Sequence, residues 1–159
     1  MAEKDATLQL VTFQLGQEHY GVDIMEVDGI VREDNIRSVP NVPPSVEGIF
    51  NLRGKIIPVI NLHRRFHLRK AELSEEDQLL GGLVILNIND MLIGVIIDKI
   101  SRVVTIERNK VQPPPQMISG IGAEYIKGVA HEEGGYLIIL DIHRLFDPRE
   151  IRQLGNLAK

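Results

Sequence analysis

The chain of 159 residues contains no cysteine and no tryptophan, and aromatic residues make up only 4% of it. Without cysteine there can be no disulfide framework, no thiolate nucleophile and no cysteine-ligated metal site, and this composition fits a reducing compartment. The N-terminus lacks an apolar stretch typical of a signal peptide, and no apolar run approaches the roughly 18 residues of a membrane span. We therefore expect a cytoplasmic protein.

Excess positive charge is also absent, because 18 Lys and Arg residues stand against 22 Asp and Glu residues. A net charge of −4 offers no electrostatic footprint for a nucleic acid. The hydrophobic fraction of 43% is ordinary for a globular domain, and with so few aromatic residues the core must be built from Ile, Val and Leu. A chain of this length buries roughly 70% of its unfolded surface, so it needs no disulfide or metal for stability.

An internal repeat organises the chain. Residues 46–66, VEGIFNLRGKIIPVINLHRRF, align without a gap on residues 126–146, IKGVAHEEGGYLIILDIHRLF. Gly48 matches Gly128, and Gly54 matches Gly134. A weaker match places residues 20–31 on residues 93–104. The chain is thus interpreted as two copies of one unit of about 70 residues.

Each copy predicts about five short strands. The second copy is dense in β-branched residues between Ile93 and Ile106, which favours extended structure over the helix that the spacing of residues 24–31 would also allow. We expect first strands at 8–15 and 82–88, a bulge near 25–26 and 98–99, and hairpins that pair 48–52 with 56–61 and 128–131 with 136–141. A charged segment, residues 68–78, separates the copies.

This pattern predicts a mainly all-β fold of two five-stranded SH3-like β-barrels related by the repeat. The first barrel is expected at about 8–68 and the second at about 79–147. A short helix should follow each hairpin, and a C-terminal helix should span about 148–157. Asp147, Pro148 and Glu150 supply the start signals of that helix, and Ile151, Leu154 and Leu157 form its apolar stripe.

A search for catalytic motifs finds none. No phosphate-binding loop is present, and the string from Gly120 to Tyr125 lacks the third glycine of a dinucleotide fingerprint. His63 and His67 have a spacing that could hold zinc, with His143 as the repeat equivalent of His63. No third ligand supports this, so we interpret His63 and His143 as surface residues. Asp23, Asp98, Asp141 and Glu124 lie scattered among strands and loops, and an Asp at a strand end more often accepts backbone hydrogen bonds than abstracts a proton.

Two surface features remain. The aliphatic series Val11, Ile24, Val27 and Ile30 either packs in the core or faces outward from a narrow barrel. Arg53 lies at the tip of the first hairpin, and its repeat equivalent is Glu133. The turn alone does not require this reversal of charge, and arginine is common at binding hot spots. A solvated turn arginine is the alternative.

At these residues the sequence resembles the CheW family of bacterial chemotaxis coupling proteins. The resemblance rests on residues 13–27, on residues 46–62 with their Gly-x-x-Asn-Leu-Arg-Gly string, and on residues 125–146. It covers nearly the whole chain as a single CheW-like domain, residues 1–159. It implies a non-enzymatic adaptor without cofactor or metal, which couples the cytoplasmic tip of chemoreceptors to the regulatory domain of a CheA-type histidine kinase, in the cytoplasm at membrane-bound receptor arrays.

The resemblance also implies sites. The receptor helix would bind a groove lined by Val11, Ile24, Val27, Ile30, Ile93 and Gly94. The kinase would contact Gly48, Asn51 and Arg53, and a second kinase contact would lie near Gln112 and Met117. Gly29 and Gln112 depart from the acidic and basic residues that family members often carry there. The alternative function is a small-barrel oligonucleotide-binding module, which would need basic grooves and stacking aromatic residues.

Overall fold

A computed structural model describes residues 6–32, 36–114, 123–132, 135–146 and 148–157. The first repeat unit contains β1 (Thr7–Leu15), β2 (Glu18–Asp23), the 3-10 helix η1 (Ile24–Glu26), β3 (Val27–Val31), β4 (Val46–Leu52), β5 (Lys55–Ile60) and α2 (Leu62–Phe66). A short helix, α3 (Glu75–Gln78), precedes the second unit. That unit contains β6 (Gly82–Ile88), β7 (Met91–Ile97), β8 (Lys99–Glu107), η2 (Arg108–Lys110), η3 (Ala123–Tyr125), β9 (Ile126–Glu132), β10 (Gly135–Leu140) and α4 (Ile142–Leu145), and α5 (Pro148–Leu157) follows it.

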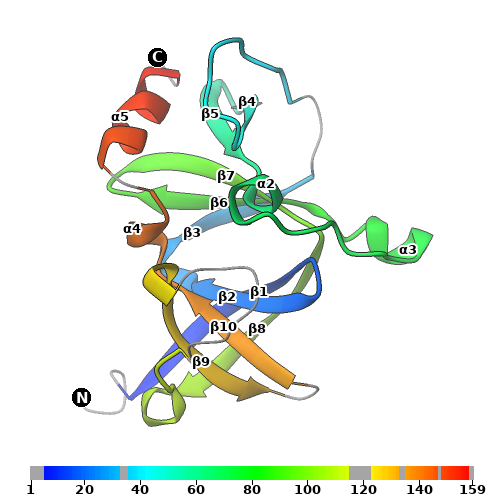
Figure 1. Ribbon diagram of the computed structural model, residues 1–159, viewed down its shortest axis with the longest axis vertical. Helices are drawn as coiled ribbons and strands as arrows, with labels where there is room; N and C mark the ends of the chain where they lie inside the picture. Colours follow the sequence, from blue (N-terminus) through cyan, green and yellow to red (C-terminus); the bar gives the residue numbers. More distant parts are fainter. Residues whose placement is uncertain (1–5, 33–35, 115–122, 133–134, 147, 158–159) are drawn as a thin grey trace.

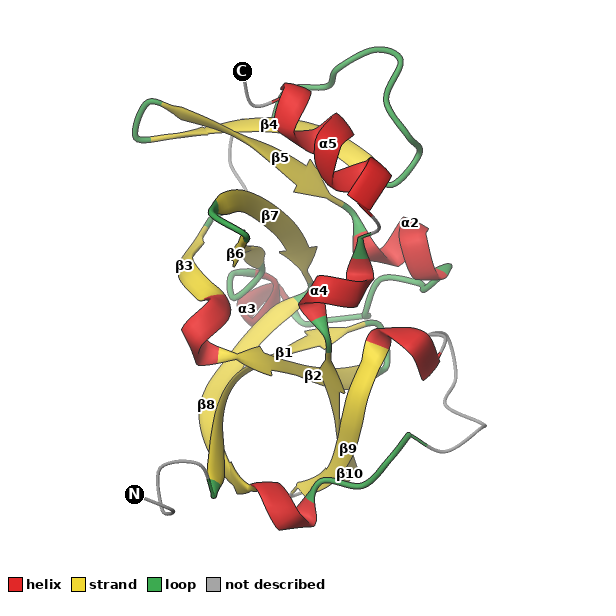
Figure 2. Ribbon diagram, turned by 90° about the vertical axis from the view of Figure 1, so that its left-hand side faces the viewer, coloured by secondary structure: helices red, strands yellow, loops and turns green. Residues whose placement is uncertain are grey.

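The strands form two five-stranded sheets, stacked along the long axis of the molecule (Figure 1). Sheet A has the order β8-β1-β2-β10-β9, and sheet B has the order β3-β6-β7-β5-β4. Sheet A curls so that its two ends approach each other (Figure 2). The predicted all-β class, with two five-stranded units and short helices after the hairpins, is confirmed.

The boundaries predicted for the two barrels, 8–68 and 79–147, are wrong. Sheet A takes β1 and β2 from the first repeat unit but β8, β9 and β10 from the second, and sheet B takes the complementary strands. The chain crosses between the sheets at η1, after β2, and at Asp98, after β7. These are the positions where a bulge was predicted. The alternation changes phase there because the strand leaves one sheet and enters the other.

Three clusters of buried side chains result from this exchange. The largest, which we call the shared cluster, lies between the sheets and combines residues of both, such as Phe13 and Tyr20 of sheet A with Leu86 and Ile93 of sheet B. Two smaller clusters, the sheet A cluster and the sheet B cluster, fill the concave sides of the two sheets. Strands such as β1 bury both faces, with Leu8 and Leu10 in the sheet A cluster and Val11, Phe13 and Leu15 in the shared cluster. Such a strand carries apolar residues on both of its faces rather than on one.

The glycines repeated at 48 and 128 have a packing role. The chain before each hairpin crosses the outer edge of the hairpin's first strand. Arg37 exchanges two backbone hydrogen bonds with Ile49, and Gln112 exchanges two with Val129. A Cβ on Gly48 would lie 2.0 Å from the carbonyl oxygen of Arg37, and a Cβ on Gly128 would lie 2.9 Å from that of Gln112. The crossing segment therefore requires glycine at both positions.

The C-terminal helix α5 begins and ends where the sequence predicts. It lies near β5 in Figure 2, and Leu154 is buried in the shared cluster. The predicted cap, Asp147, lies outside the described residues. Glu150 instead accepts a hydrogen bond from Arg65 of α2, with 2.7 Å between Nη2 and Oε1. The helix is thus tied to the end of the first repeat unit. None of the described helices is long and apolar enough to span a membrane.

Candidate functional site

The tip of the β4–β5 hairpin is the first candidate surface. Arg53 and Gly54 form its two-residue loop, and both have positive φ angles, 52° and 86°. This is the geometry of a type I′ turn, which favours Asn-Gly and similar pairs over a long side chain at the first position. Asn51 Oδ1 accepts a hydrogen bond of 2.9 Å from the amide of Gly54 and supports the turn.

Arg53 is exposed at this tip, and within the described parts of the chain its guanidinium has neither a hydrogen bond nor an ion pair. The turn requires a left-handed conformation at this position but does not require an arginine there. We call Asn51, Arg53 and Gly54 the tip surface.

Gly48 was predicted to contact the kinase together with Asn51 and Arg53, but the structure does not place it on an exposed surface. Gly48 is buried beneath Arg37, so it supports the hairpin rather than offering an exposed contact.

The second candidate surface runs along η1 and the edge strand β3. Ile24 and Val27 are partly buried against the shared cluster, whereas Ile30 is 46% exposed. A register shift between Val27 and Gly29 turns Val31 toward the sheet B cluster and leaves Ile30 outside. Met25, which the sequence analysis did not single out, is 86% exposed beside Ile24. We call Ile24, Met25, Val27 and Ile30 the β3 surface.

The other predicted receptor-binding residues are buried. Val11 and Ile93 belong to the shared cluster, with exposures of 5% and 0%. A Cβ on Gly94 would face Ile85, Leu83 and Val59 on the concave side of sheet B. The prediction that these three residues line an open groove is therefore contradicted, because each repeat unit contributes strands to both sheets and β1 and β7 lie at the centre of the molecule.

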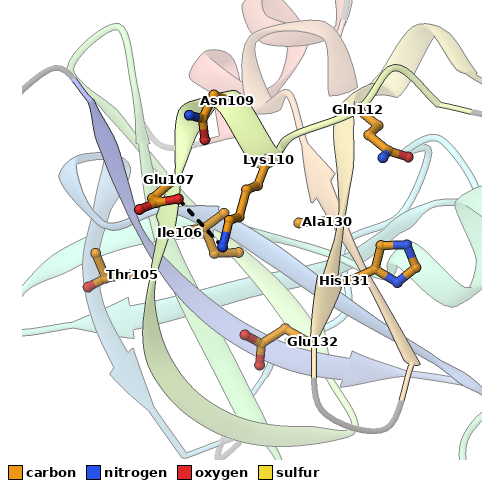
Figure 3. Close-up of a pocket in the computed structure, with 9 residues that line it drawn as sticks. All are labelled: Thr105, Ile106, Glu107, Asn109, Lys110, Gln112, Ala130, His131 and Glu132. Carbon is orange, nitrogen blue, oxygen red and sulfur yellow. Dashed lines mark ion pairs between the residues drawn. The ribbon is translucent and has the colours of Figure 1, made fainter.

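Gln112 is exposed near the free edge of β9 and exchanges two backbone hydrogen bonds with Val129, each of 2.8 Å. It lines a cavity of about 600 Å³ between β8 and β9 (Figure 3). Met117, the other residue predicted for the second kinase contact, lies outside the described residues. The structure therefore places one member of this pair on an open surface and leaves the other undescribed.

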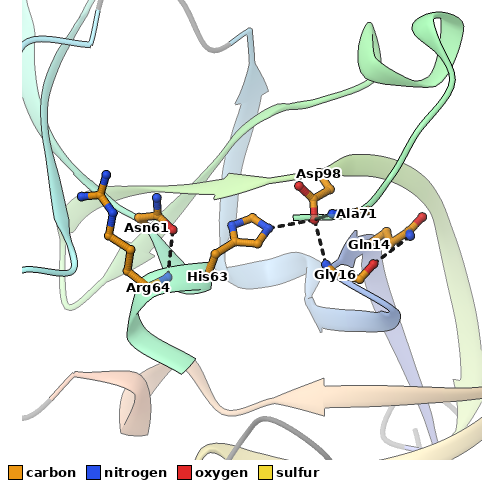
Figure 4. Close-up of polar contacts among 7 residues, drawn as sticks. All are labelled: Gln14, Gly16, Asn61, His63, Arg64, Ala71 and Asp98. Atoms are coloured by element: carbon orange, nitrogen blue, oxygen red, sulfur yellow. Dashed lines mark hydrogen bonds and ion pairs between the residues drawn. The ribbon is translucent and has the colours of Figure 1, made fainter. Parts of the chain in front are cut away.

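His63 is not the surface residue that was predicted. It is buried at the start of α2, and its Nε2 lies 2.8 Å from Asp98 Oδ2 (Figure 4). The same carboxylate accepts hydrogen bonds from the amides of Gly16, at 2.7 Å, and Ala71, at 3.1 Å. Asp98 thus joins the β1–β2 turn, α2 and the segment before α3 at the β7–β8 crossover. His143, the repeat equivalent of His63, is instead exposed, and its Nε2 lies 3.5 Å from Glu26 Oε1.

Two opposing effects act on the pKa of Asp98. Burial raises it, but the hydrogen bonds from His63, Gly16 and Ala71 outweigh burial and hold the pKa below its ordinary value. The side chains of His63 and Asp98 are only 5% and 8% exposed, so a substrate has no access to them. Within the described residues no group of three metal-ligating side chains occurs either. The pair is therefore structural.

Comparisons with known proteins agree with this geometry. A family model described as the CheW-like domain matches residues 9–150. The chain belongs to the CheW family. It is 57% identical to "Chemotaxis protein CheW" of Treponema pallidum over 99% of this chain and 92% of that protein. It is 29% identical to the chemotaxis protein CheW of Klebsiella aerogenes over 95% of this chain and 89% of that one.

A solved structure supports the same assignment. The crystal structure of the scaffolding protein TtCheW from Thermoanaerobacter tengcongensis matches with a TM-score of 0.78 and 36% identity, over 88% of each chain. As a member of the CheW family, this protein is a non-enzymatic chemotaxis adaptor. The oligonucleotide-binding alternative is not favoured, since the net charge is negative and only seven residues are aromatic.

Proposed function

We propose that this adaptor joins the regulatory domain of a CheA-type histidine kinase to the cytoplasmic tip of a chemoreceptor, and that it does so through the tip surface and the β3 surface. The observation that carries the proposal is the exposed guanidinium of Arg53, which has no partner among the described residues and is held in a backbone conformation that glycine or asparagine would adopt more easily. Such a role places the protein in the cytoplasm, at receptor arrays.

The tip surface is the proposed kinase contact. A two-residue turn holds Arg53 away from the sheet, and Asn51 is tied into the same turn by its side chain. A rigid turn lowers the entropy that binding must overcome, and arginine can donate several hydrogen bonds in a fixed geometry. Gly48 contributes by holding β4 under the crossing segment, not by touching the kinase.

The Arg53→Glu variant is expected to bind the kinase regulatory domain at least about tenfold more weakly, because loss of a charged hot-spot contact costs roughly 1.4 kcal/mol or more. Isothermal titration calorimetry measures this. The midpoint of thermal unfolding should stay unchanged, since Arg53 packs against no core residue. The Arg53→Gly variant should show the same weakening and a turn that is no less stable.

Lys55→Glu is the matched control, because it introduces the same charge on an exposed neighbour in the same hairpin. An equal loss of affinity in both charge-reversal variants would mean that the kinase senses general charge rather than Arg53. Unchanged affinity of Arg53→Glu would remove Arg53 from the interface.

The β3 surface is the proposed receptor contact. Ile24, Val27 and Ile30 would meet an amphipathic helix directly, and this is helix-in-groove recognition. Val11, Ile93 and Gly94 would not contact the helix. They would contribute indirectly, by fixing the positions of β1 and β7 in the interior. Met25 extends the exposed apolar area at the end of the surface.

Ile30→Asp should weaken binding of a receptor-tip fragment by about tenfold or more, because a carboxylate would lose its hydration against an apolar helix face. Affinity for the kinase regulatory domain should not change. Leu79→Asp, at an exposed leucine after α3, is the control and should affect neither partner. Full receptor affinity of Ile30→Asp would place the receptor elsewhere on the molecule.

A further inference from the structure

Asp28 is the one aspartate of the chain that a glycine follows, and the sequence contains no Asn-Gly pair. The Asp-Gly pair is chemically reactive, because the amide nitrogen of the glycine can attack the side-chain carboxyl carbon and close a five-membered succinimide ring. Glycine favours this ring closure, since it has no Cβ to hinder the attack and the widest choice of backbone angles. A fold suppresses the reaction where it holds the aspartate rigidly in a regular strand or helix.

The structure does not hold Asp28 in a regular ladder. β3 is an edge strand of sheet B, and no described residue pairs with its outer side (Figure 2). Val27 lies opposite Leu86, and Gly29 lies opposite the next residue of β6, so two steps along β3 match a single step along β6. Asp28 is therefore the extra residue of a β-bulge, which leaves it unpaired and disturbs the ladder locally.

The surroundings of Asp28 and Gly29 leave the reacting groups free. The carboxylate of Asp28 is exposed, and among the residues that the structure describes it accepts no hydrogen bond and forms no ion pair. Apart from its chain neighbours, no atom lies within 4 Å of a Cβ placed on Gly29. The side chain can thus turn toward the amide of Gly29, and the ring has room to form.

The other described aspartates lack this combination. Four of them have a carboxylate that a hydrogen bond or an ion pair restrains: Asp23, Asp77, Asp98 and Asp141. The fifth, Asp90, is exposed, but Met91 follows it, and a side chain at that position hinders ring closure. Sequence and local structure therefore agree only at Asp28, and Asp90 provides an internal comparison.

We propose that Asp28 is a site of spontaneous isoaspartate formation, and that this modification displaces the end of β3. In the first step a bond forms between the nitrogen of Gly29 and the side-chain carboxyl carbon of Asp28, and a water molecule leaves. In the second step water adds back to the ring. Attack on the side-chain carbonyl restores aspartate, whereas attack on the main-chain carbonyl yields isoaspartate. The mass of the protein is unchanged, and the reaction needs no oxidant, reductant or cofactor.

The modification changes the β3 surface because it lengthens the main chain of β3 by one carbon atom. The Cβ of Asp28 becomes part of the main chain, and the former α-carboxyl group becomes the side chain. Ile30 and Val31 pair with β6 after the bulge, so the added atom acts on their register. Ile30 is the most exposed aliphatic residue of β3. This effect does not depend on which partner binds there, so the inference goes beyond the proposed function and does not rest on it.

Incubation of the folded protein at neutral pH, followed by proteolysis and electron-transfer mass spectrometry, measures isoaspartate at each position. Isoaspartate at position 28 should accumulate at least about tenfold faster than at Asp90, because only Asp28 has a glycine after it. Its rate should lie within about tenfold of the rate in a synthetic peptide of residues 22–32, since the bulge leaves Asp28 unpaired. A larger suppression in the folded protein would show that β3 protects Asp28 and would overturn the proposal.

Two variants test the ring closure. Gly29→Ala keeps Asp28 and adds a Cβ that has room in the fold, yet that Cβ hinders the attack, so isoaspartate should fall several-fold. Asp28→Glu keeps the charge but can close only a six-membered ring, so position 28 should stay unmodified. Circular dichroism checks that both variants fold. Equal accumulation in Gly29→Ala and wild type would rule out the succinimide route and overturn the proposal.

Amide hydrogen exchange of the modified form, separated from the unmodified protein by chromatography, tests the effect on β3. Of the amides of Ile30 and Val31, the one bonded to β6 should exchange at least about tenfold faster than in the unmodified protein. The amide of Ile138 in sheet A is the control and should not change. Unchanged exchange at residues 30 and 31 would show that β3 accommodates the added carbon, and would overturn the proposed displacement.

Enzymatic repair gives a final check. An L-isoaspartyl O-methyltransferase transfers a methyl group from S-adenosylmethionine to the isoaspartyl carboxylate. The methyl ester then loses methanol as the succinimide closes again, and hydrolysis returns part of it to aspartate. Treatment of the modified form should therefore restore slow exchange at β3 in the repaired fraction. Absence of methyl transfer to position 28 in an incubated sample would contradict isoaspartate as the product.

Discussion

The Gly48→Ala variant is expected to lose about 3 kcal/mol of unfolding free energy, at the upper end for overpacking. The added Cβ would lie 2.0 Å from the carbonyl oxygen of Arg37, which is backbone and cannot rotate away. The segment around Arg37 would have to leave the edge of β4 and give up its two hydrogen bonds to Ile49. Urea unfolding followed by circular dichroism measures the loss.

Gly29→Ala is the matched control on β3, the opposite edge strand of sheet B, because no atom lies within 4 Å of a Cβ placed there. Its unfolding free energy should change by no more than about 0.5 kcal/mol. A Gly48→Ala protein as stable as wild type but unable to bind the kinase would reverse our interpretation, and would make Gly48 a contact residue after all.

The Asp98→Ala variant should be destabilised by a similar amount, about 3 kcal/mol, because it leaves several buried polar groups without a partner. The amides of Gly16 and Ala71 and the ring of His63 all bond one carboxylate oxygen, and an unpaired buried group costs roughly 1–3 kcal/mol. Asp141→Ala removes a half-buried cap, which accepts one hydrogen bond of 3.2 Å from the amide of His143 and lies 3.6 Å from Arg144, and should cost only about 1 kcal/mol. A loss for Asp98→Ala no larger than for Asp141→Ala would contradict the network.

The pH dependence of unfolding tests the same network. Because the folded-state pKa of Asp98 lies below its ordinary value of about 3.9, the ionised carboxylate stabilises the fold above that value. This contribution is lost as the pH falls from about 5 through the lower folded-state pKa. Asp98→Asn should show a smaller drop in stability over that range. An identical pH profile in wild type and Asp98→Asn would show that Asp98 titrates normally.

The local features that could be predicted are those that depend on short stretches of chain. The hairpin tip at Arg53 and Gly54, the first strands and the start of the C-terminal helix all follow from turn residues, β-branched runs and capping residues near in sequence. The repeat added the equivalence of Gly48 and Gly128, and the family resemblance added the adaptor role. What could not be predicted depends on which strands become neighbours.

The case of His63 shows this limit. In sequence it stands in a basic helical turn beside Arg64 and Arg65, which is typical of a solvated surface. Its partner Asp98 is 35 residues away, at a crossover between sheets that the repeat did not reveal. Burial of a histidine is favourable only where a hydrogen-bonding partner is present in the fold. The residues next to His63 in sequence give no indication of where that partner lies.

The sequence by itself determined the class of the fold, the two-copy plan, the positions of the turns and the family. The tertiary structure decided that the copies exchange strands, that Val11, Ile93 and Gly94 lie inside, and that Arg53, Ile30 and Gln112 face outward. The physical reason is that aliphatic strands are compatible with either face of a sheet, and only the shared core between two sheets decides which residues lose their contact with water.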